Sequence, residues 1–401
     1  MDTRLKVIPD GSISSTPGFR AGAVAAGIKK VAGALDLGVV TADRPCTAAA
    51  VFTSNRFKAA PVVLSQRHLA SGNVRAIIVN AGCANAGTGK IGYNNASAMT
   101  ETAAHKLGID QKSVLAASTG VIGVQLPIEK IRAGIDRLEL STGGGHDFAR
   151  AIMTTDTIPK ESAVTSPEYG FTVAGCAKGS GMIHPDMATM LGFITTDAAI
   201  GAANLQRLLK RAVDKSFNVI SVDGDTSTND CVFLLSSGAA GIELKPGAAA
   251  YRAFREALDY VCVHLARGIA RDGEGATKLI EMTVTGAASA ADARKVTRTV
   301  LSSPLVKTAV HGADPNWGRI VAAAGRSGAK FDFDRANLKI GEVEVLKNGA
   351  PLPFDKKLAS AQFAGKDVHI RLDLGLGGAS VTGWGCDMST EYVRINADYT
   401  T

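Results

Sequence analysis

Residues Lys178-Gly-Ser-Gly-Met-Ile-His-Pro-Asp-Met-Ala-Thr-Met-Leu191 combine a glycine-rich run with one small residue, Ala188, directly before Thr189. A hydroxyl in this position can attack the preceding carbonyl, shift the backbone from amide to ester and let water complete the cut. The new chain then begins with a threonine whose free amine lies beside its own hydroxyl. That amine titrates near pH ~8 and can act as a base. The segment therefore predicts self-cleavage between Ala188 and Thr189.

Taken alone, an Ala-Thr dipeptide is common and more often lies in a strand or at the start of a helix. The rest of the chain supplies the context. It carries Pro17-Gly-Phe-Arg-Ala21, Gly27-Ile-Lys29, Asn80-Ala-Gly-Cys-Ala-Asn-Ala-Gly-Thr-Gly89, Ser118-Thr-Gly-Val-Ile-Gly123, Met153-Thr-Thr-Asp-Thr157, Ser221-Val-Asp-Gly-Asp-Thr-Ser-Thr-Asn-Asp230, Gly273-Glu-Gly-Ala-Thr-Lys278, His311-Gly-Ala-Asp-Pro-Asn-Trp-Gly-Arg319 and Tyr392-Val-Arg-Ile-Asn-Ala397. In this order the motifs resemble those of the ornithine acetyltransferase family, the bifunctional glutamate N-acetyltransferases of arginine biosynthesis.

The resemblance implies an activity. It is acetyl transfer from N-acetylornithine to glutamate, by a ping-pong mechanism through an acetyl ester on Thr189. Members of the family differ in whether acetyl-CoA is also a donor, and the sequence leaves that point open. The resemblance further implies a heterotetramer of two α and two β chains cut from one precursor, with no cofactor.

The resemblance also implies the residues of the site. Acyl transfer passes through a tetrahedral oxyanion that needs preorganised donors, and Thr119 with Gly120 supply them in the family. From the residues alone, 117–123 is a loop between a strand and a helix. The substrate-binding positions are Thr154, Lys178, Thr189, Glu274, Asn396 and Thr401, with Thr155 an open alternative to Thr154. Asp223 and Asp225 are interpreted as loop-capping carboxylates.

Two other functions fit the same nucleophile. A self-processing amidase or aminopeptidase would use a similar N-terminal-nucleophile fold, although such hydrolases typically carry serine after the cut. A non-catalytic relative would keep the fold as a scaffold, but the intact Ala188-Thr189 step argues against it. A denaturing gel and an assay of acetyl transfer separate the three.

The composition argues against several other classes of protein. The formal charge of +7 is spread along 401 residues and aromatics make up 5%, so neither a basic face nor a stacking surface for nucleic acid is indicated. The six cysteines are far apart and the histidines form no spaced pairs, which favours a cytoplasmic protein without disulfides or metal. The opening residues do not have the pattern of a signal peptide, and no apolar run reaches the ~18 residues that a membrane span needs, so neither is expected. Gly273–Lys278 and Gly375–Gly378 lack the order of a phosphate or dinucleotide loop.

Strands alternate with helices, which indicates an α/β (α+β) fold. Helices are expected at 204–217 and 250–269 and after Ser289, and strands at 75–79, 279–285, 338–345 and 369–374. The segment 306–319 has no clear type. We place a boundary near Gly286, between a nucleophile-bearing domain, 1–285, and a smaller α/β domain, 286–401. The resemblance implies that the first is a layered α-β-β-α domain of the N-terminal-nucleophile type.

Overall fold

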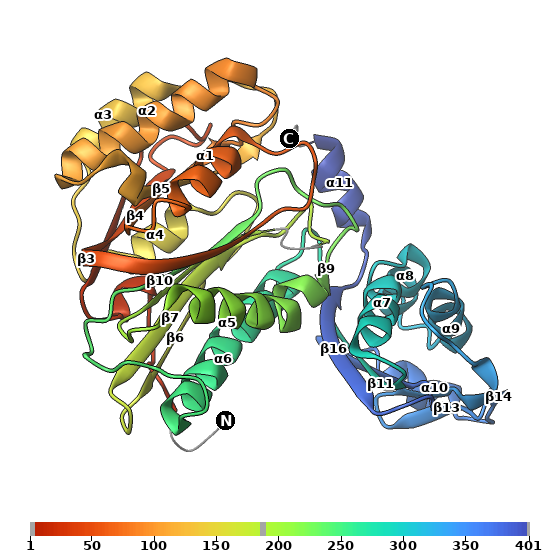
Figure 1. The fold of residues 1–401 in the computed structure, drawn as a ribbon. Helices are drawn as coiled ribbons and strands as arrows, with labels where there is room; N and C mark the ends of the chain where they lie inside the picture. The colour runs from red at the N-terminus through yellow and green to blue at the C-terminus, as the bar shows by residue number, and fades with distance from the viewer. Residues whose placement is uncertain (1–4, 185–189, 399–401) are drawn as a thin grey trace.

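The computed structural model describes residues 5–184 and 190–398, which form two groups of strands with helices against them (Figure 1). The strands of the first group are β1 (Lys6–Val7), β2 (Phe19–Val24), β3 (Leu37–Phe52), β4 (Val74–Cys83), β5 (Val114–Val121), β6 (Lys160–Ser166), β7 (Phe171–Lys178), β8 (Leu191–Thr196) and β10 (Cys231–Ser236). Its helices are α1 (Ala60–Leu69), α2 (Gly89–Leu107), α3 (Ile128–Asp136), α4 (Gly145–Ala151), α5 (Ala202–Lys215) and α6 (Ala249–Arg271).

The strands of the second group are β9 (Ile220–Ser221), β11 (Leu279–Ala287), β12 (Asn337–Ile340), β13 (Val343–Lys347), β14 (Ala350–Pro351), β15 (Asp367–Asp373) and β16 (Ala379–Cys386). The remaining helices are α7 (Ala290–Leu301), α8 (Pro304–His311), α9 (Trp317–Gly325), α10 (Lys356–Ala361) and α11 (Thr390–Asp398). None of the helices in the described ranges is both long and apolar enough to span a membrane.

The long strand β3 builds two sheets at once. Its first half pairs with β2 and β4, as in Val39 opposite Ile78, and its second half pairs with β10, as in Val51 opposite Val232. The strand order is β1-β6-β7-β8-β10-β3-β4-β5, with β2 also beside β3. Because β3 changes partners along its length, the two halves of this path can pack face to face.

Three hydrophobic layers separate the two sheets and their helices. Side chains alternate between the faces of a strand, so on β8 Phe193 points to the layer between the sheets and Ile194 to the layer under α5 and α6. The inner layer joins β8 and β10 to β4 and β5, with Phe193 near Phe148 and Phe233. A third layer lies between β4 or β5 and helices α1, α2 and α3. The predicted α-β-β-α layering is thereby confirmed.

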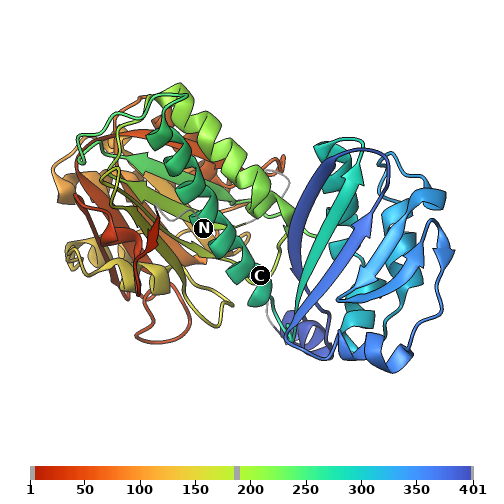
Figure 2. The same ribbon diagram turned by 90° about the horizontal axis from the view of Figure 1, so that it is seen from below.

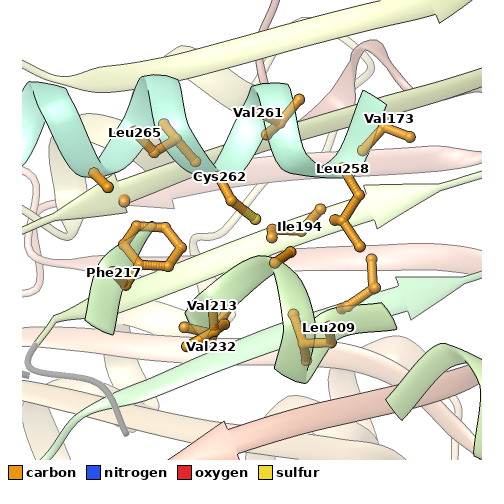
Figure 3. Close-up of a cluster of buried hydrophobic side chains, with 14 of the residues drawn as sticks. Val173, Ile194, Leu209, Val213, Phe217, Val232, Leu258, Val261, Cys262 and Leu265 are labelled. Carbon is orange, nitrogen blue, oxygen red and sulfur yellow. The ribbon is translucent and has the colours of Figure 1, made fainter. Parts of the chain in front are cut away.

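Helices α5 and α6 cover one face of the first group with the apolar faces that their sequences predict. Leu209, Val213 and Phe217 meet Leu258 and Leu265 above the strands (Figure 3). The predicted helices at 204–217 and 250–269 are confirmed as α5 and α6, with small differences at their ends.

The second group is a mixed sheet beside the first (Figure 2). Its order is β14-β13-β12-β15-β11-β16-β9, and α7 and α9 pack on it around one core. Strand β9 precedes this region in sequence and pairs with β16, which ties the two groups together. Strand β11 spans the predicted boundary at 285/286, and that division of the chain stays a prediction.

The predicted strand at 338–345 is wrong in one respect. The structure has two short strands there, β12 and β13, which pair antiparallel with Ile340 opposite Val343. Gly341 turns the chain between them with φ +54, a conformation that glycine adopts without strain. The segment of unclear type, 306–319, lies mostly in α8 and the start of α9.

Candidate active site

A pocket of about 240 Å³ lies where strands of both sheets end. Its lining includes all of the predicted site residues that the structure describes, namely Thr119, Gly120, Thr154, Lys178, Glu274 and Asn396. The alternative Thr155 lines it too. Ala188, Thr189 and Thr401 lie outside the described residues. Met190 and Leu191, which directly follow Thr189 in sequence, also line the pocket.

Strand pairing brings the two ends of the quoted segment together. Lys178 ends β7 and lies opposite Leu191, which begins β8. On the other side of β8, Leu191 is paired with Cys231 at the start of β10, and the Cys231 N–H donates to the Met190 carbonyl at 3.1 Å. Residues 13 apart in sequence therefore lie side by side at one edge of the sheet.

Thr119 and Gly120 lie in β5, which ends at Val121, so the expectation of a loop at 117–123 is wrong for most of that segment. Parallel pairing with β4 runs in register to Gly82 opposite Gly120 and, after a shift, ends at Cys83, which holds this end of β5 extended. Gly120 has φ +124, and a Cβ on it would lie 2.3 Å from the Gly82 carbonyl carbon. Only glycine fits this crossing of backbones.

The side-chain amide of Asn229 joins the ends of β4 and β5 by hydrogen bonds. It donates to the carbonyls of Ala84 at 2.6 Å and Ser118 at 2.8 Å, and Asn229 itself is buried and lines the pocket. The side chain thus joins the ends of β4 and β5 to the residues that lead into β10. Sequence reasoning quoted this asparagine within its motif but gave it no part in the site.

Lys178 and Thr154 form one wall of the pocket. The Lys178 ammonium donates to the Thr154 hydroxyl at 2.8 Å and lies 3.8 Å from a carboxylate oxygen of Asp156. Burial disfavours the charged form of Asp156, but the ammonium groups of Lys178 and Lys160 outweigh it and hold the pKa of this carboxyl well below its ordinary value. Sequence reasoning missed Asp156, although it lies in the quoted motif Met153–Thr157.

Glu274 and Asn396 form an opposite part of the lining. The Asn396 amide donates to the Glu274 carboxylate at 2.8 Å, so α11 reaches back from the second group to the pocket (Figure 1). Gly181 leaves room for this carboxylate, since a Cβ there would lie 2.4 Å from it. Gly275 adopts φ +67 and leaves room for the backbone of Tyr392, since a Cβ there would lie 2.4 Å from the Tyr392 nitrogen.

The predicted capping role of Asp223 is confirmed. Its carboxylate accepts hydrogen bonds from the backbone N–H groups of Met182 and Ile183, just ahead of the undescribed residues 185–189. Burial raises the pKa of Asp223. The pKa of Tyr392 is also raised above its ordinary value. Burial is the largest cause, and the negative charges of Asp223 and Glu274 add to it. The pocket therefore combines one ammonium with several carboxyl groups. In the described part of the chain, no group of three metal-ligating side chains gathers.

Comparison with known proteins identifies the family. A family model described as the ArgJ family matches residues 20–401. This chain belongs to the ArgJ family. It is 54% identical to the arginine biosynthesis bifunctional protein ArgJ of Dehalococcoides mccartyi, with both chains covered in full. It is 50% identical to the protein of the same name from Symbiobacterium thermophilum, over 98% of this chain and 99% of that one.

Two solved structures also match. The crystal structure of an ArgJ protein from Bacillus halodurans shares 46% identity and a TM-score of 0.51, over 53% of this chain and 100% of that chain. Ornithine acetyltransferase from Mycobacterium tuberculosis, crystallised with ornithine, shares 42% identity and a TM-score of 0.44, over 46% and 100%. The family predicted from the motifs is confirmed, and with it an acyltransferase of arginine biosynthesis.

The crossing at Gly120 predicts a large cost for a small substitution. Gly120→Ala would place a methyl group against the Gly82 backbone at a positive φ, so it should cost about 2–5 kcal/mol, adding overpacking to backbone strain. Gly108→Ala is the matched control, because Gly108 has φ +65 but open space around its Cβ position. It should cost only about 1–2 kcal/mol. Thermal unfolding of both variants measures the difference. Equal unfolding midpoints for the two variants would contradict the prediction, because they would show that β4 and β5 can move apart to admit the methyl group.

Proposed function

We propose that this chain transfers an acetyl group from N-acetylornithine to glutamate, by way of an acetyl ester on Thr189, after cleavage between Ala188 and Thr189. The observation that carries the proposal is the pocket, in which Thr119, Gly120, Lys178 and Glu274 gather beside Met190. Their chemistry matches the needs of acyl transfer between amino acids. The chain belongs to the ArgJ family, whose relatives are named for arginine biosynthesis, and this supports placing the reaction in that pathway.

The length of a solved relative supports the cut. The Bacillus halodurans chain is covered completely by 53% of this chain. Residues 189–401 number 213 of the 401 residues, which is also 53%. A chain that began at Thr189 would have the size of that solved chain.

The reaction divides into two acyl transfers. In the first, the Thr189 hydroxyl attacks the acetyl carbonyl of N-acetylornithine and gives its proton to the Thr189 amine, and the α-amine of ornithine takes a proton as it leaves. In the second, the glutamate amine attacks the ester, N-acetylglutamate leaves and the threonine hydroxyl is restored. The Thr119 hydroxyl and the Gly120 N–H would donate to the oxyanion of each tetrahedral intermediate.

The pocket's charges suit amino acids. Lys178 would pair with the α-carboxylate that acetylornithine and glutamate share. Glu274 would pair with an ammonium group of ornithine, which carries a second amine that must be recognised without reacting. Thr154, Asn396 and Thr401 would complete the contacts, with Thr155 still an alternative to Thr154.

The proposal extends to a second donor, the assembly, the domains and the compartment. Because the relatives are named bifunctional, acetyl-CoA is the second acetyl donor to test beside acetylornithine. The assembly of two α and two β chains and the division at 285/286 rest on the resemblance. The cytoplasm is the proposed compartment because all six cysteines are free thiols.

Thr189→Ala should give one uncut chain with no transferase activity, because cleavage and transfer lose the same hydroxyl. Thr189→Ser should still cut, since serine supplies an equivalent hydroxyl. A denaturing gel with mass spectrometry measures the first effect and an acetyl-transfer assay the second. Wild-type protein that stays full length and is nevertheless active would refute the proposed cut.

Glu274→Gln keeps the size of the side chain and removes its charge. It should weaken the use of acetylornithine by about 1.5–3 kcal/mol in kcat/KM, the scale of a hydrogen bond to a charged group. Cleavage should survive, because it needs no external substrate. Glu281→Gln is the control, since Glu281 is a partly buried acid of β11 that bonds Trp384 in the second sheet. Wild-type kinetics in the Glu274 variant would remove Glu274 from the site.

A further inference from the structure

Four charged side chains form a row that ends at the pocket wall. The Lys160 ammonium lies 2.6 Å from carboxylate oxygens of both Asp272 and Asp156, and Asp156 in turn faces Lys178 at 3.8 Å. The exposed fractions of these side chains are 6% for Asp272, 2% for Lys160, 0% for Asp156 and 9% for Lys178. Only Lys178, at the end of the row, lines the pocket. Charges this deeply buried persist only when they are paired.

Asp156 holds three parts of the pocket wall at once. One of its oxygens accepts the Thr154 N–H at 3.0 Å and faces Lys178. The other accepts the Gly179 N–H at 2.7 Å and the Lys160 ammonium at 2.6 Å. Thr154, Lys178 and Gly179 all line the pocket. Because the Asp156 side chain is fully buried, it cannot itself touch a substrate.

The geometry leaves Lys178 free to serve a second anion. An ammonium group has three N–H donors, and the Thr154 hydroxyl takes one of them at 2.8 Å. Asp156 stands 3.8 Å away, which is beyond hydrogen-bonding distance, so it takes none of the other donors. An incoming carboxylate can therefore be bound directly by the remaining N–H donors of Lys178, which lines the pocket.

We propose that Asp156 is the positioning residue for substrate carboxylates, acting through Lys178 and Thr154, and that Lys160 and Asp272 hold Asp156 in place. This inference rests on the proposed function, because it takes Lys178 as the carboxylate-binding group. Among the described residues, Asp156 bonds Thr154, Lys160 and Gly179 and not Thr119 or Gly120, the proposed oxyanion-hole residues. Its loss should therefore weaken binding of every α-amino acid that uses the pocket and leave the chemical step largely intact.

Asp156→Asn tests the proposal, because it keeps the shape and removes the charge. Calorimetry should show the Kd for ornithine and the Kd for glutamate both raised, roughly ten- to a hundredfold, the scale of one charge-assisted hydrogen bond. KM should rise in the same proportion for acetylornithine and glutamate, with kcat within about threefold of wild type. Cleavage should go to completion. Asp197→Asn is the matched control, because Asp197 is a buried aspartate after β8 that accepts the Thr172 N–H at 2.7 Å.

A second substitution separates positioning from mere support of the fold. In a Lys178→Gln background the charged group that Asp156 positions is gone and only Thr154 remains, so adding Asp156→Asn should raise the Kd for ornithine by a smaller factor than it does in wild type. Losses that multiply in the double variant would overturn the proposal. If Asp156→Asn alone is insoluble, the pair Asp156→Asn with Lys160→Gln removes one charge of each sign, and the same Kd measurement applies to it.

The two claims fail in different ways. Folded, cleaved Asp156→Asn with wild-type Kd values for ornithine and glutamate would overturn this inference alone. A change confined to one of the two ligands, or a fall in kcat with Kd unchanged, would also overturn it. If ornithine binding depends on Asp156 and Lys178 as described, but the wild-type chain transfers no acetyl group, the proposed reaction would be wrong and the positioning role of Asp156 would still be supported.

Discussion

The pairing of β8 between β7 and β10 is the constraint on which the pocket depends. Antiparallel pairing sets Lys178 across from Leu191, and parallel pairing sets Cys231 on the other side of the same residue. Side chains alternate along a strand, so a slip of one residue between β7 and β8 would turn Lys178 to the other face. Apolar residues of this sheet are buried on both faces, which makes such a slip costly. The register of three buried strands thus sets the position of the polar wall.

The strands β4 and β5 contribute a further part of the pocket lining, which a buried amide joins to β10. Asn229 precedes β10 and bonds carbonyls at the ends of β4 and β5, so the strand ends of both sheets are joined by one side chain. Gly120 can lie at this junction because it has no Cβ to meet Gly82. Helix α11 then closes the pocket from the second group, where Asn396 meets Glu274. Residues from four separate parts of the sequence converge in this way.

Most site residues could be predicted because their motifs resemble those of a known family, and the structure supplies a physical reason for the glycines among them. Gly181 and Gly275 beside Glu274 illustrate this, as each leaves space that a Cβ would fill. The helices α5 and α6 were predictable because one apolar stripe on each faces the sheet. The hairpin at Gly341 was missed, although the apolar alternation changes phase there, from Leu338 and Ile340 before the turn to Val343 and Val345 after it.

The buried charges were harder to predict. Lys160 and Asp272 are 112 residues apart, and nothing in their local sequence distinguishes them from solvated surface residues. Only the packing of α6 against β6 brings them together. Asp156 lay in a quoted motif, yet its contact with Lys178 depends on the end of β7 and could not be inferred from spacing. Pairs of this kind depend on tertiary structure, because burial makes pairing a necessity only after the chain has folded.

The central claim is that acetyl transfer passes through the first residue of the cleaved chain. The most direct measurement is the intact mass of that chain after wild-type enzyme is incubated with N-acetylornithine alone and quenched in acid. The account predicts the mass of one added acetyl group, located at Thr189 by fragmentation, and its disappearance when glutamate is added before the quench. Transfer that proceeds while this chain never carries an acetyl group, or carries it at another residue, would contradict the account.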